Sequence, residues 1–522
     1  MNSENIYDAL TDISDKFIIE AQEHKLGKSR KAIIQWCAIA ASLMFVIGIG
    51  SYIWTNNGSL PVPGGNTGGG GRVDGNTTFM SYAGPVFPLS VLSDSNGISA
   101  SRNISFDFSG FGESRTNENN LLLNHSDVLI TDGYTLNNDT NDDKVLQIIY
   151  PFASDFSDLH RLHPVITADG KKLEAELIAG SYTGGFTDIE GLEADRVNLA
   201  SINSWEDYIS LLADGSYLRN ALGDWVMFDQ TVTVYEFTNV RGDHEKLAAP
   251  TLAAEFNLDY ERTTVLTFNF NGAEYDYENG YMRRSFFVPK EDSPEYNRSY
   301  YMIVVGDDIT SLNIQGYENG GCHEGEEVEH TFADVTRYEA VFGDILALMF
   351  DDFMEQYNRG RAGEPDYSDS LLSDEMLYRA STELLRTYGV MSDNAAWRYR
   401  TGELADIFSE TIVMDRVFYL TVEIDIPARE SVVINIEMIK PGSFDFYGSG
   451  SENVGIYGYD MLTKLGSNLL FTETTAGISG IERINIVKQN FGFDLENGVL
   501  NVILDIEEPH YYLEVRGASL DE

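Results

Sequence analysis

Cysteine is nearly absent from this sequence: its 522 residues include only Cys37 and Cys322. Cys37 lies inside an uncharged apolar run, where a thiol behaves as a small, inert, buried side chain. The rest of the chain contains Cys322 alone, so no intrachain disulfide can form there. This excludes a small secreted module held together by disulfides and indicates a core large enough to be stable without them.

Basic residues are scarce as well, with 35 Lys and Arg against 83 Asp and Glu and a formal net charge of −48. Such a charge repels polyanions, so the composition excludes nucleic acid as a partner. An acidic surface suits a well-solvated protein, loose binding of divalent cations or a basic partner. Solvation is the simplest of these interpretations, because charge runs usually mark solvated surfaces.

Motifs for nucleophilic catalysis and phosphate binding are also missing, since the chain has no G-x-S-x-G, S-x-x-K or G-x-x-x-x-G-K sequence. Paired carboxylates that hydrolyse a glycosidic bond need only a suitable separation, which a sequence does not reveal. We therefore predict no catalytic residue, no cofactor and a non-enzymatic function. We keep a cell-surface hydrolase only as a third hypothesis, after a binding or sensing protein and a surface scaffold or adhesion protein.

Charge is absent from one long run, residues 32–54 (AIIQWCAIAASLMFVIGIGSYIW). A helix of about 20 apolar residues spans the hydrocarbon core of a bilayer. Lys25, Lys28, Arg30 and Lys31 precede the run, and Arg72 is the first basic residue after it. The positive-inside rule then places the N-terminus in the cytoplasm and the large part of the chain that follows the run, here called the body, outside. A cleaved signal peptide would have a shorter apolar core and a small-residue cleavage site, so we expect a retained anchor.

The 31 residues before this run predict an amphipathic helix. Ile6, Leu10, Ile13 and Phe17 recur at steps of three and four and form one apolar stripe. Helices that adsorb to membrane surfaces normally carry Lys and Arg on the polar side, whereas this segment is acidic there. We therefore predict that these four residues bind a cytoplasmic protein partner.

The remainder predicts a mainly β protein with α insertions, in which β-sandwich-like domains flank a helical block. The predicted organisation is a cytoplasmic helix (1–31), a transmembrane helix (32–54), a Gly-rich linker (55–78), a β-rich extracytoplasmic region (79–330), a helical block (331–412) and a C-terminal β domain (413–522). Short β-rich runs separated by turn residues indicate sandwiches rather than a parallel α/β sheet.

Several elements within this outline are predicted individually. Asp169-Gly170 favours a hairpin between strands 165–168 and 173–177. The strictly alternating runs 418–426 and 432–438, joined by the turn 427–430, predict the clearest hairpin in the chain. Helices are expected at 204–214, 335–357 and 371–388, the last closed by Gly389.

Two segments partly resemble metal sites. Cys322, His323, Glu324 and His330 are suitable zinc ligands, but the two His are seven residues apart behind a Gly-Gly turn, so a solvated acidic loop is preferred.

Asp139, Asn141 and Asp143 imitate the first ligands of a calcium loop, but Lys144 and Tyr150 stand where Gly and Glu are required. A hairpin tip is the preferred interpretation, because Asn and Asp also favour turns.

Five segments together resemble an uncharacterised family of membrane-anchored extracytoplasmic proteins from Gram-positive, Clostridia-like bacteria. They are DALTDISDKFIIEAQ, SYAGPVFPLSVL, GYDMLTKLGSNLLFTE, QNFGFDLENG and HYYLEVR. The resemblance implies no activity and no functional residues. The short N-terminal segment 1–31, here called the head, followed by a single span also resembles anti-sigma-factor-like proteins. This resemblance implies signalling to transcription. The head has only His24 and lacks the zinc ligands of one anti-sigma class.

Our first hypothesis is accordingly a membrane-anchored sensor or binding protein. It would bind an extracytoplasmic ligand of unknown identity and signal through the N-terminal helix. The alternative is a surface scaffold or adhesion protein whose head only assists membrane insertion.

Overall fold

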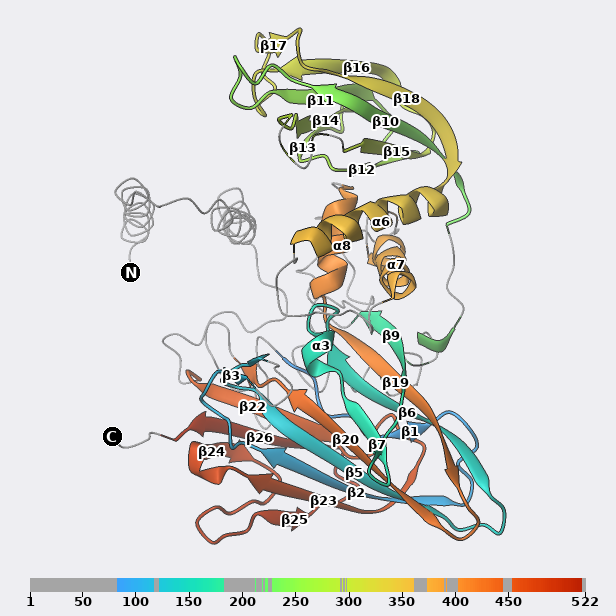
Figure 1. The fold of residues 1–522 in the computed structure, drawn as a ribbon, viewed down its shortest axis with the longest axis vertical. Coiled ribbons are helices and arrows are strands. Elements are labelled where there is room, and N and C mark those ends of the chain that lie inside the picture. Colours follow the sequence, from blue (N-terminus) through green and yellow to red (C-terminus); the bar gives the residue numbers. More distant parts are fainter. Residues whose placement is uncertain are drawn as a thin grey trace. The chain divides into compact units, whose positions relative to one another are not determined.

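The computed structural model describes residues 82–116, 122–182, 228–291, 298–360, 373–388, 402–444 and 453–518, with a few isolated residues between these ranges. This part of the chain is mainly β, as predicted (Figure 1). None of its helices is long and apolar enough to cross a bilayer. The predicted span at 32–54, the head and the linker lie outside the described residues.

The largest sheet has seven strands in the order β25-β23-β2-β5-β20-β7-β8. Their bounds are β2 Ile98–Asp107, β5 Val128–Asn138, β7 Val165–Ala168, β8 Lys171–Lys172, β20 Ser431–Lys440, β23 Leu470–Ser479 and β25 Asn501–Ile503. Neighbours are antiparallel except β2 and β23, which run parallel. Side chains alternate along β2 between buried and exposed positions, so one side of this sheet faces a core and the other faces solvent.

Two four-stranded sheets form the opposing layer, in the orders β1-β6-β19-β9 and β21-β22-β26-β24. Their bounds are β1 Ser90–Val91, β6 Lys144–Ser154, β9 Glu176–Tyr182, β19 Arg416–Ile426, β21 Ser443–Phe444, β22 Ile456–Leu462, β24 Ile484–Gln489 and β26 His510–Gly517. The segment before β1 joins the two sheets, because Val86 bridges Met461 of β22 while Ser90 pairs with Ile149 of β6. A short hairpin, β3 Arg115–Thr116 and β4 Leu122–Leu123, and the 3₁₀ turn Ile481–Arg483 complete this module.

The predicted hairpin at 418–438 is wrong. β19 and β20 do follow one another through the turn 427–430, but β19 pairs with β6 and β20 pairs with β5, in different sheets. The turn 139–143 likewise carries the chain from one layer to the other and is not a hairpin tip, because β5 and β6 belong to different sheets. Strict alternation shows which side of a strand is buried. In a sandwich, two successive strands can lie in opposite layers with their buried sides facing each other across the core.

Strands from both ends of the described chain therefore share each layer. Strands formed before residue 183 pair with strands formed after residue 415, so pairing crosses the boundary predicted at 412 and 413. Asp169-Gly170 does form a hairpin, but its second strand is β8, Lys171–Lys172, and the predicted strand 173–177 is wrong as a hairpin partner. The following strand, β9, pairs instead with β19.

A second β-sandwich is inserted between β9 and β19. Its sheets have the orders β12-β15-β10-β18 and β13-β14-β11-β16-β17. The bounds are β10 Thr231–Arg241, β11 Thr251–Asn257, β12 Thr263–Phe268, β13 Gly272–Asp276, β14 Tyr281–Phe287, β15 Tyr300–Gly306, β16 Thr310–Tyr317, β17 Glu327–Val328 and β18 Phe332–Val341. Phe286 stacks on Tyr300 at 3.8 Å between ring centroids and meets Phe270 edge-on, so aromatic rings from both sheets fill this core.

Helices follow the inserted sandwich. They are α6 Phe342–Gly360, α7 Asp374–Glu383 with a π-helical turn at Leu384–Tyr388, and α8 Leu404–Val413; the single-turn helix α3 Leu159–Leu162 lies earlier in the chain. The predicted helix at 335–357 is wrong over its first seven residues, because 335–341 belong to β18, which pairs with β10. The expected helix at 204–214 and the C-cap Gly389 lie outside the described residues, apart from Leu212.

One buried carboxylate attaches α8 to the inserted sandwich. Glu403, just before α8, accepts hydrogen bonds from the Thr267 hydroxyl at 2.8 Å and the Asn269 amide at 2.9 Å. Arg284 lies 3.6 Å from the same carboxylate. Burial raises the pKa of Glu403 to about 8, although Arg284 and these hydrogen bonds act in the opposite direction. Phe268 and Phe408 also pack across this contact.

A charged pair lies in the core of the first sandwich. Arg102 of β2 donates from Nε and Nη2 to the two oxygens of Asp132 of β5, at 2.8 Å each, and both side chains are inaccessible. Its remaining donors reach main-chain carbonyls of the opposing layer, among them Leu462 at 2.6 Å. Tyr134 and Tyr150 donate to Asp132 as well. This buried pair is therefore fully hydrogen-bonded, which is the condition under which such a pair is tolerated.

Candidate functional site

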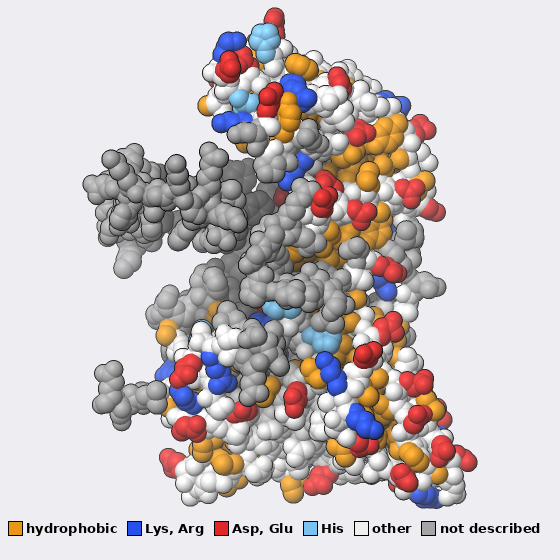
Figure 2. All heavy atoms as spheres, in the orientation of Figure 1, with side chains coloured by type: hydrophobic (Ala, Val, Ile, Leu, Met, Phe, Trp, Pro, Cys, Tyr) orange, Lys and Arg blue, Asp and Glu red, His pale blue; other side chains and the backbone are white. Residues whose placement is uncertain are grey.

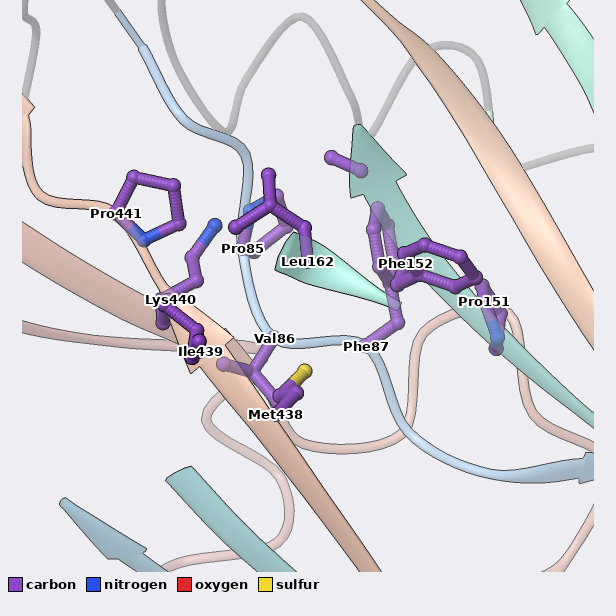
Figure 3. A pocket seen from close by; sticks show the side chains of 11 residues that line it. Pro85, Val86, Phe87, Pro151, Phe152, Leu162, Met438, Ile439, Lys440 and Pro441 are labelled. Atoms are coloured by element: carbon purple, nitrogen blue, oxygen red, sulfur yellow. The ribbon is translucent and has the colours of Figure 1, made fainter. Parts of the chain in front are cut away.

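A pocket opens beside the end of β20, lined by residues 85–87, 151–153, Leu162 and 438–441. The cavity has room for about one water molecule, which is far below the volume of a small-molecule site. In Figure 3, Lys440 and Pro441 lie on one side of Leu162, and Phe152 and Pro151 lie on the other. Most of the lining residues are apolar, and the space that they enclose is too small for a small-molecule ligand.

Lys440 supplies the amine in this pocket. The side chain is buried, and Nζ donates a hydrogen bond to the main-chain carbonyl of Ala83 at 2.5 Å. Burial lowers the pKa of Lys440 to about 8, while the carboxylates of Asp460 and Asp415 act to raise it. A lysine with this pKa exists partly as the free amine near neutral pH, but the carbonyl of Ala83 holds it in place.

Asp460 of β22 lies close to this lysine. Its Oδ2 accepts a hydrogen bond from the Tyr82 hydroxyl and lies 3.0 Å from Nε2 of His510 in β26. Oδ1 is buried and has no hydrogen-bond partner among the described residues. Tyr82, Lys440, Asp460 and His510 thus form a buried polar cluster that ties the segment before β1 to three strands, β20, β22 and β26. Its geometry is that of a structural anchor, because each group is held by the main chain or by another member.

The residues that partly resemble a zinc site do not converge. Cys322 is buried against Ala253 and Tyr317, with a left-handed backbone (φ +48°), whereas His323, Glu324 and His330 are exposed. Burial raises the pKa of the Cys322 thiol, which disfavours the thiolate that binds metal. Among the described residues, no group of three or more His, Cys, Asp or Glu is arranged to hold a metal ion.

The three residues that resemble calcium ligands accept hydrogen bonds from neighbouring turns and strands. Asp143 accepts from the Ala428 amide at 2.9 Å, and Asn141 accepts from Arg429 Nε at 3.0 Å. Asp139 accepts from the Ser99 hydroxyl at 3.0 Å. These side chains join the turn 139–143 to the turn 427–430 and to the start of β2, so they act in the fold of the sandwich.

The predicted partner-binding residues Ile6, Leu10, Ile13 and Phe17 lie outside the described residues. Arg102, Asp132 and Asp460, in contrast, were not singled out from the sequence, although a signal was present. Arg102 has the same strand parity as the buried Ile104 and Phe106, so alternation already places a charge on the inward side.

Comparison with known proteins gives no further assignment, since no family model, curated protein or solved structure matches this chain.

Proposed function

We propose that this chain is a single-pass, membrane-anchored binding or sensing protein whose body, from residue 79 onward, lies outside the cell. The observation that carries the proposal is the uncharged run at 32–54, preceded closely by four basic residues and followed by none until Arg72. The resemblance to membrane-anchored proteins of Gram-positive bacteria implies the same topology.

The architecture of the body favours binding over catalysis. Two sandwiches whose sheets pack face to face present broad outer surfaces, and such surfaces suit extended ligands or partners better than enclosed substrates. The one amine in the pocket is already bound to Ala83, and the polar groups around Asp460 point toward one another. These groups maintain the fold of the binding body.

The head would signal to the cytoplasm that the body has bound its extracytoplasmic ligand. Its apolar stripe of Ile6, Leu10, Ile13 and Phe17 fits the groove of a helical or globular protein partner, a recognition mode that reads residues at steps of three and four. Acidic residues on the other side of this helix argue against adsorption to anionic lipid.

Photo-crosslinking in intact membranes tests this role of the head. A crosslinker placed at Leu10 of the full chain should capture one cytoplasmic protein, and Ile13→Asp should abolish the capture by disrupting the apolar stripe. Asp12→Ser, on the polar side, is the matched control and should leave capture unchanged. If an unrelated basic head preserves every phenotype of the protein, signalling is wrong and the scaffold or adhesion alternative takes its place.

A further inference from the structure

Strand β18, Phe332–Val341, forms an open edge of the inserted sandwich, here called the β18 edge. It pairs with β10 on one side, and no other strand of the described chain pairs with it on the other side. None of its ten residues is buried. In Figure 1 it lies beyond β10 at the right-hand margin of this sandwich, and the same margin in Figure 2 shows side chains of both charges beside hydrophobic ones.

The β18 edge differs from the other sheet edges that the structure describes. The other edge strands have seven residues or fewer, and two of them, β9 and β24, also have register shifts. β18 has ten residues, contains no Pro or Lys, and pairs with β10 without a shift over 334–341. Short strands, bulges, proline and lysine are usual means by which proteins protect a sheet edge from a further strand. Over 334–341 the β18 edge has none of these.

Main-chain groups of alternate residues in β18 point away from β10. The Phe342 amide, directly after the strand, donates to the Gln230 carbonyl beside the start of β10 at 2.9 Å. Peptide groups alternate in direction along a strand, so the even-numbered residues of β18 bond to β10 and the odd-numbered residues direct N–H and C=O outward. Within the described chain, the odd-numbered residues from 335 to 341 have no main-chain partner on this outer side. They form a row of donors and acceptors about 20 Å long.

The side chains of this row carry both charges. Arg337 and Glu339 are exposed and lie two positions apart, so they project from the same side of the strand. Like charges directly opposite each other destabilise a pair of strands, so protection against a second copy needs charges of one sign only. The chain has 83 Asp and Glu from which such a row could be built. An Arg and a Glu at this spacing are instead complementary to a second copy of the same strand.

Hydrogen bonding and charge define the register of such a pair. Two copies related by a two-fold axis pair antiparallel, with the odd-numbered residues of one copy opposite those of the other. With the axis at Arg337 or at Glu339, like charges would meet. With the axis at Tyr338, Arg337 of each copy lies opposite Glu339 of the other. Val335 then lies opposite Val341, which is 42% exposed in the single chain.

We propose that the β18 edge binds a second copy of this chain in the register centred on Tyr338, so that the sheets β12-β15-β10-β18 of two copies join into one continuous sheet. Each opposed pair of odd-numbered residues over 335–341 exchanges two main-chain hydrogen bonds. The acidic field of the chain opposes association, but salt screens it beyond about 10 Å at 0.1 M, whereas these bonds and ion pairs act at contact. The inference goes beyond the proposed binding or sensing function and does not depend on it.

Disulfide crosslinking of the full chain in detergent micelles tests the register. Residue 338 lies on the axis, where the Cα atoms of the two copies are about 4.5 Å apart and within reach of a disulfide. In a Cys37→Ala background, Tyr338→Cys should therefore form a crosslinked dimer on mild oxidation. Thr336→Cys is the matched control, because position 336 lies on the same side and is more exposed. Its two copies lie roughly 14 Å apart in this register, so it should not crosslink to itself.

A mixture of Thr336→Cys and Ala340→Cys chains keeps the test independent of Tyr338, whose side chain is partly buried. Positions 336 and 340 lie opposite each other in the proposed register. The mixture should give a crosslinked dimer that neither variant gives alone. Absence of a crosslink from both Tyr338→Cys and the mixture, or equal crosslinking of Thr336→Cys alone, overturns the proposal.

Light scattering of the full chain in micelles, at physiological ionic strength, measures the association itself. The parent should have the protein mass of two 58.3-kDa chains. Glu339→Arg and Arg337→Glu should each weaken the dimer by about tenfold or more in Kd, because two attractive pairs become two repulsive ones. A mixture of these two variants restores both opposite-charge pairs and should associate like the parent. Glu423→Arg, at an exposed position of β19, is the matched control and should leave the dimer unchanged.

The mixture of the two charge variants is the decisive sample. Arg337 also contacts Asp308 at 2.7 Å, so Arg337→Glu alone changes a contact within the chain, but restored association in the mixture requires that variant to be folded. A parent that stays monomeric at every concentration contradicts the proposal. A dimer that Glu339→Arg leaves intact uses another surface and contradicts it as well, and a mixture that fails to associate contradicts the register.

Discussion

Asn138 at the end of β5 donates from Nδ2 to the main-chain carbonyl of Ile426 at the end of β19, at 3.1 Å and across 288 residues of sequence. The same amide reaches Asp142 and Pro427, while its Oδ1 accepts from Thr140. One buried side chain thus fastens both turns that carry the chain between the layers of the first sandwich. The two turns depend on each other although neither closes a hairpin.

Replacing Asn138 by alanine should destabilise the protein by about 1–3 kcal/mol, because buried carbonyls lose their donor. Urea unfolding followed by circular dichroism gives the free energy of unfolding and measures this change. Asn137→Ala, one residue earlier on the outward side of β5, is the control and should change the free energy of unfolding by less than about 0.5 kcal/mol. Equal shifts for the two variants would contradict the role assigned to Asn138.

The buried pair of Arg102 and Asp132 predicts a strong non-additive effect. Arg102→Leu leaves the Asp132 carboxylate buried without its cation and should cost about 3–5 kcal/mol. The double variant Arg102→Leu/Asp132→Leu removes both charges and should recover a large part of that loss. Urea unfolding of the parent, both single variants and the double variant completes the cycle; additive losses would show that the pair is not coupled.

Glu403 predicts a pH dependence of stability. Its pKa is raised to about 8 in the folded protein and is close to 4.5 when unfolded, so the folded state holds its proton more tightly. Stability from this group is present below about pH 4.5 and is lost as pH rises toward 8. The melting temperature of the parent should therefore fall relative to that of Glu403→Gln between pH 5 and pH 8.

The control for this experiment is Glu423→Gln, which neutralises an exposed carboxylate on β19. Its melting temperature should follow that of the parent at every pH. If the parent and Glu403→Gln curves instead run parallel, Glu403 does not titrate in this range and the joint between α8 and β12 is not sensitive to pH.

Cys322 should be protected in the native protein. In a Cys37→Ala background, alkylation by iodoacetamide at pH 8 should be roughly tenfold or more slower than after unfolding, because burial disfavours the thiolate. Zinc added to the same protein should produce no metal-thiolate absorbance. Fast alkylation, or a thiolate band on adding zinc, would restore the metal site suggested by His323 and His330.

Local patterning predicted much of the secondary structure but little of the pairing. Alternation in 418–426 and 432–438 correctly identified two strands, although β19 is buried on both sides over 416–421. Alternation also carries no information on which layer holds the partner strand. The sequence predicts a helix over 335–357, whereas the structure gives 335–341 to β18. Pairing with β10 decides its conformation, and such non-local pairing overrides local propensity.

The candidate sites show the same limit. Cys322 and His330 are close in sequence, but the thiol turns into the core while the imidazole is exposed. The polar cluster around Asp460 joins Tyr82 to a strand 378 residues later in the sequence, so it becomes visible only once the pairing is known. A charged residue at an inward strand position, such as Arg102, is the one sign of a buried polar group that strand alternation alone reveals.

The most direct test of the whole account is the orientation of the chain in the membrane. Protease added to intact cells that express the full chain, or to their protoplasts, should degrade a C-terminal tag and leave an N-terminal tag on a short, membrane-embedded fragment. Survival of the C-terminal tag in intact cells, followed by its loss after lysis, would place the body inside and contradict the account.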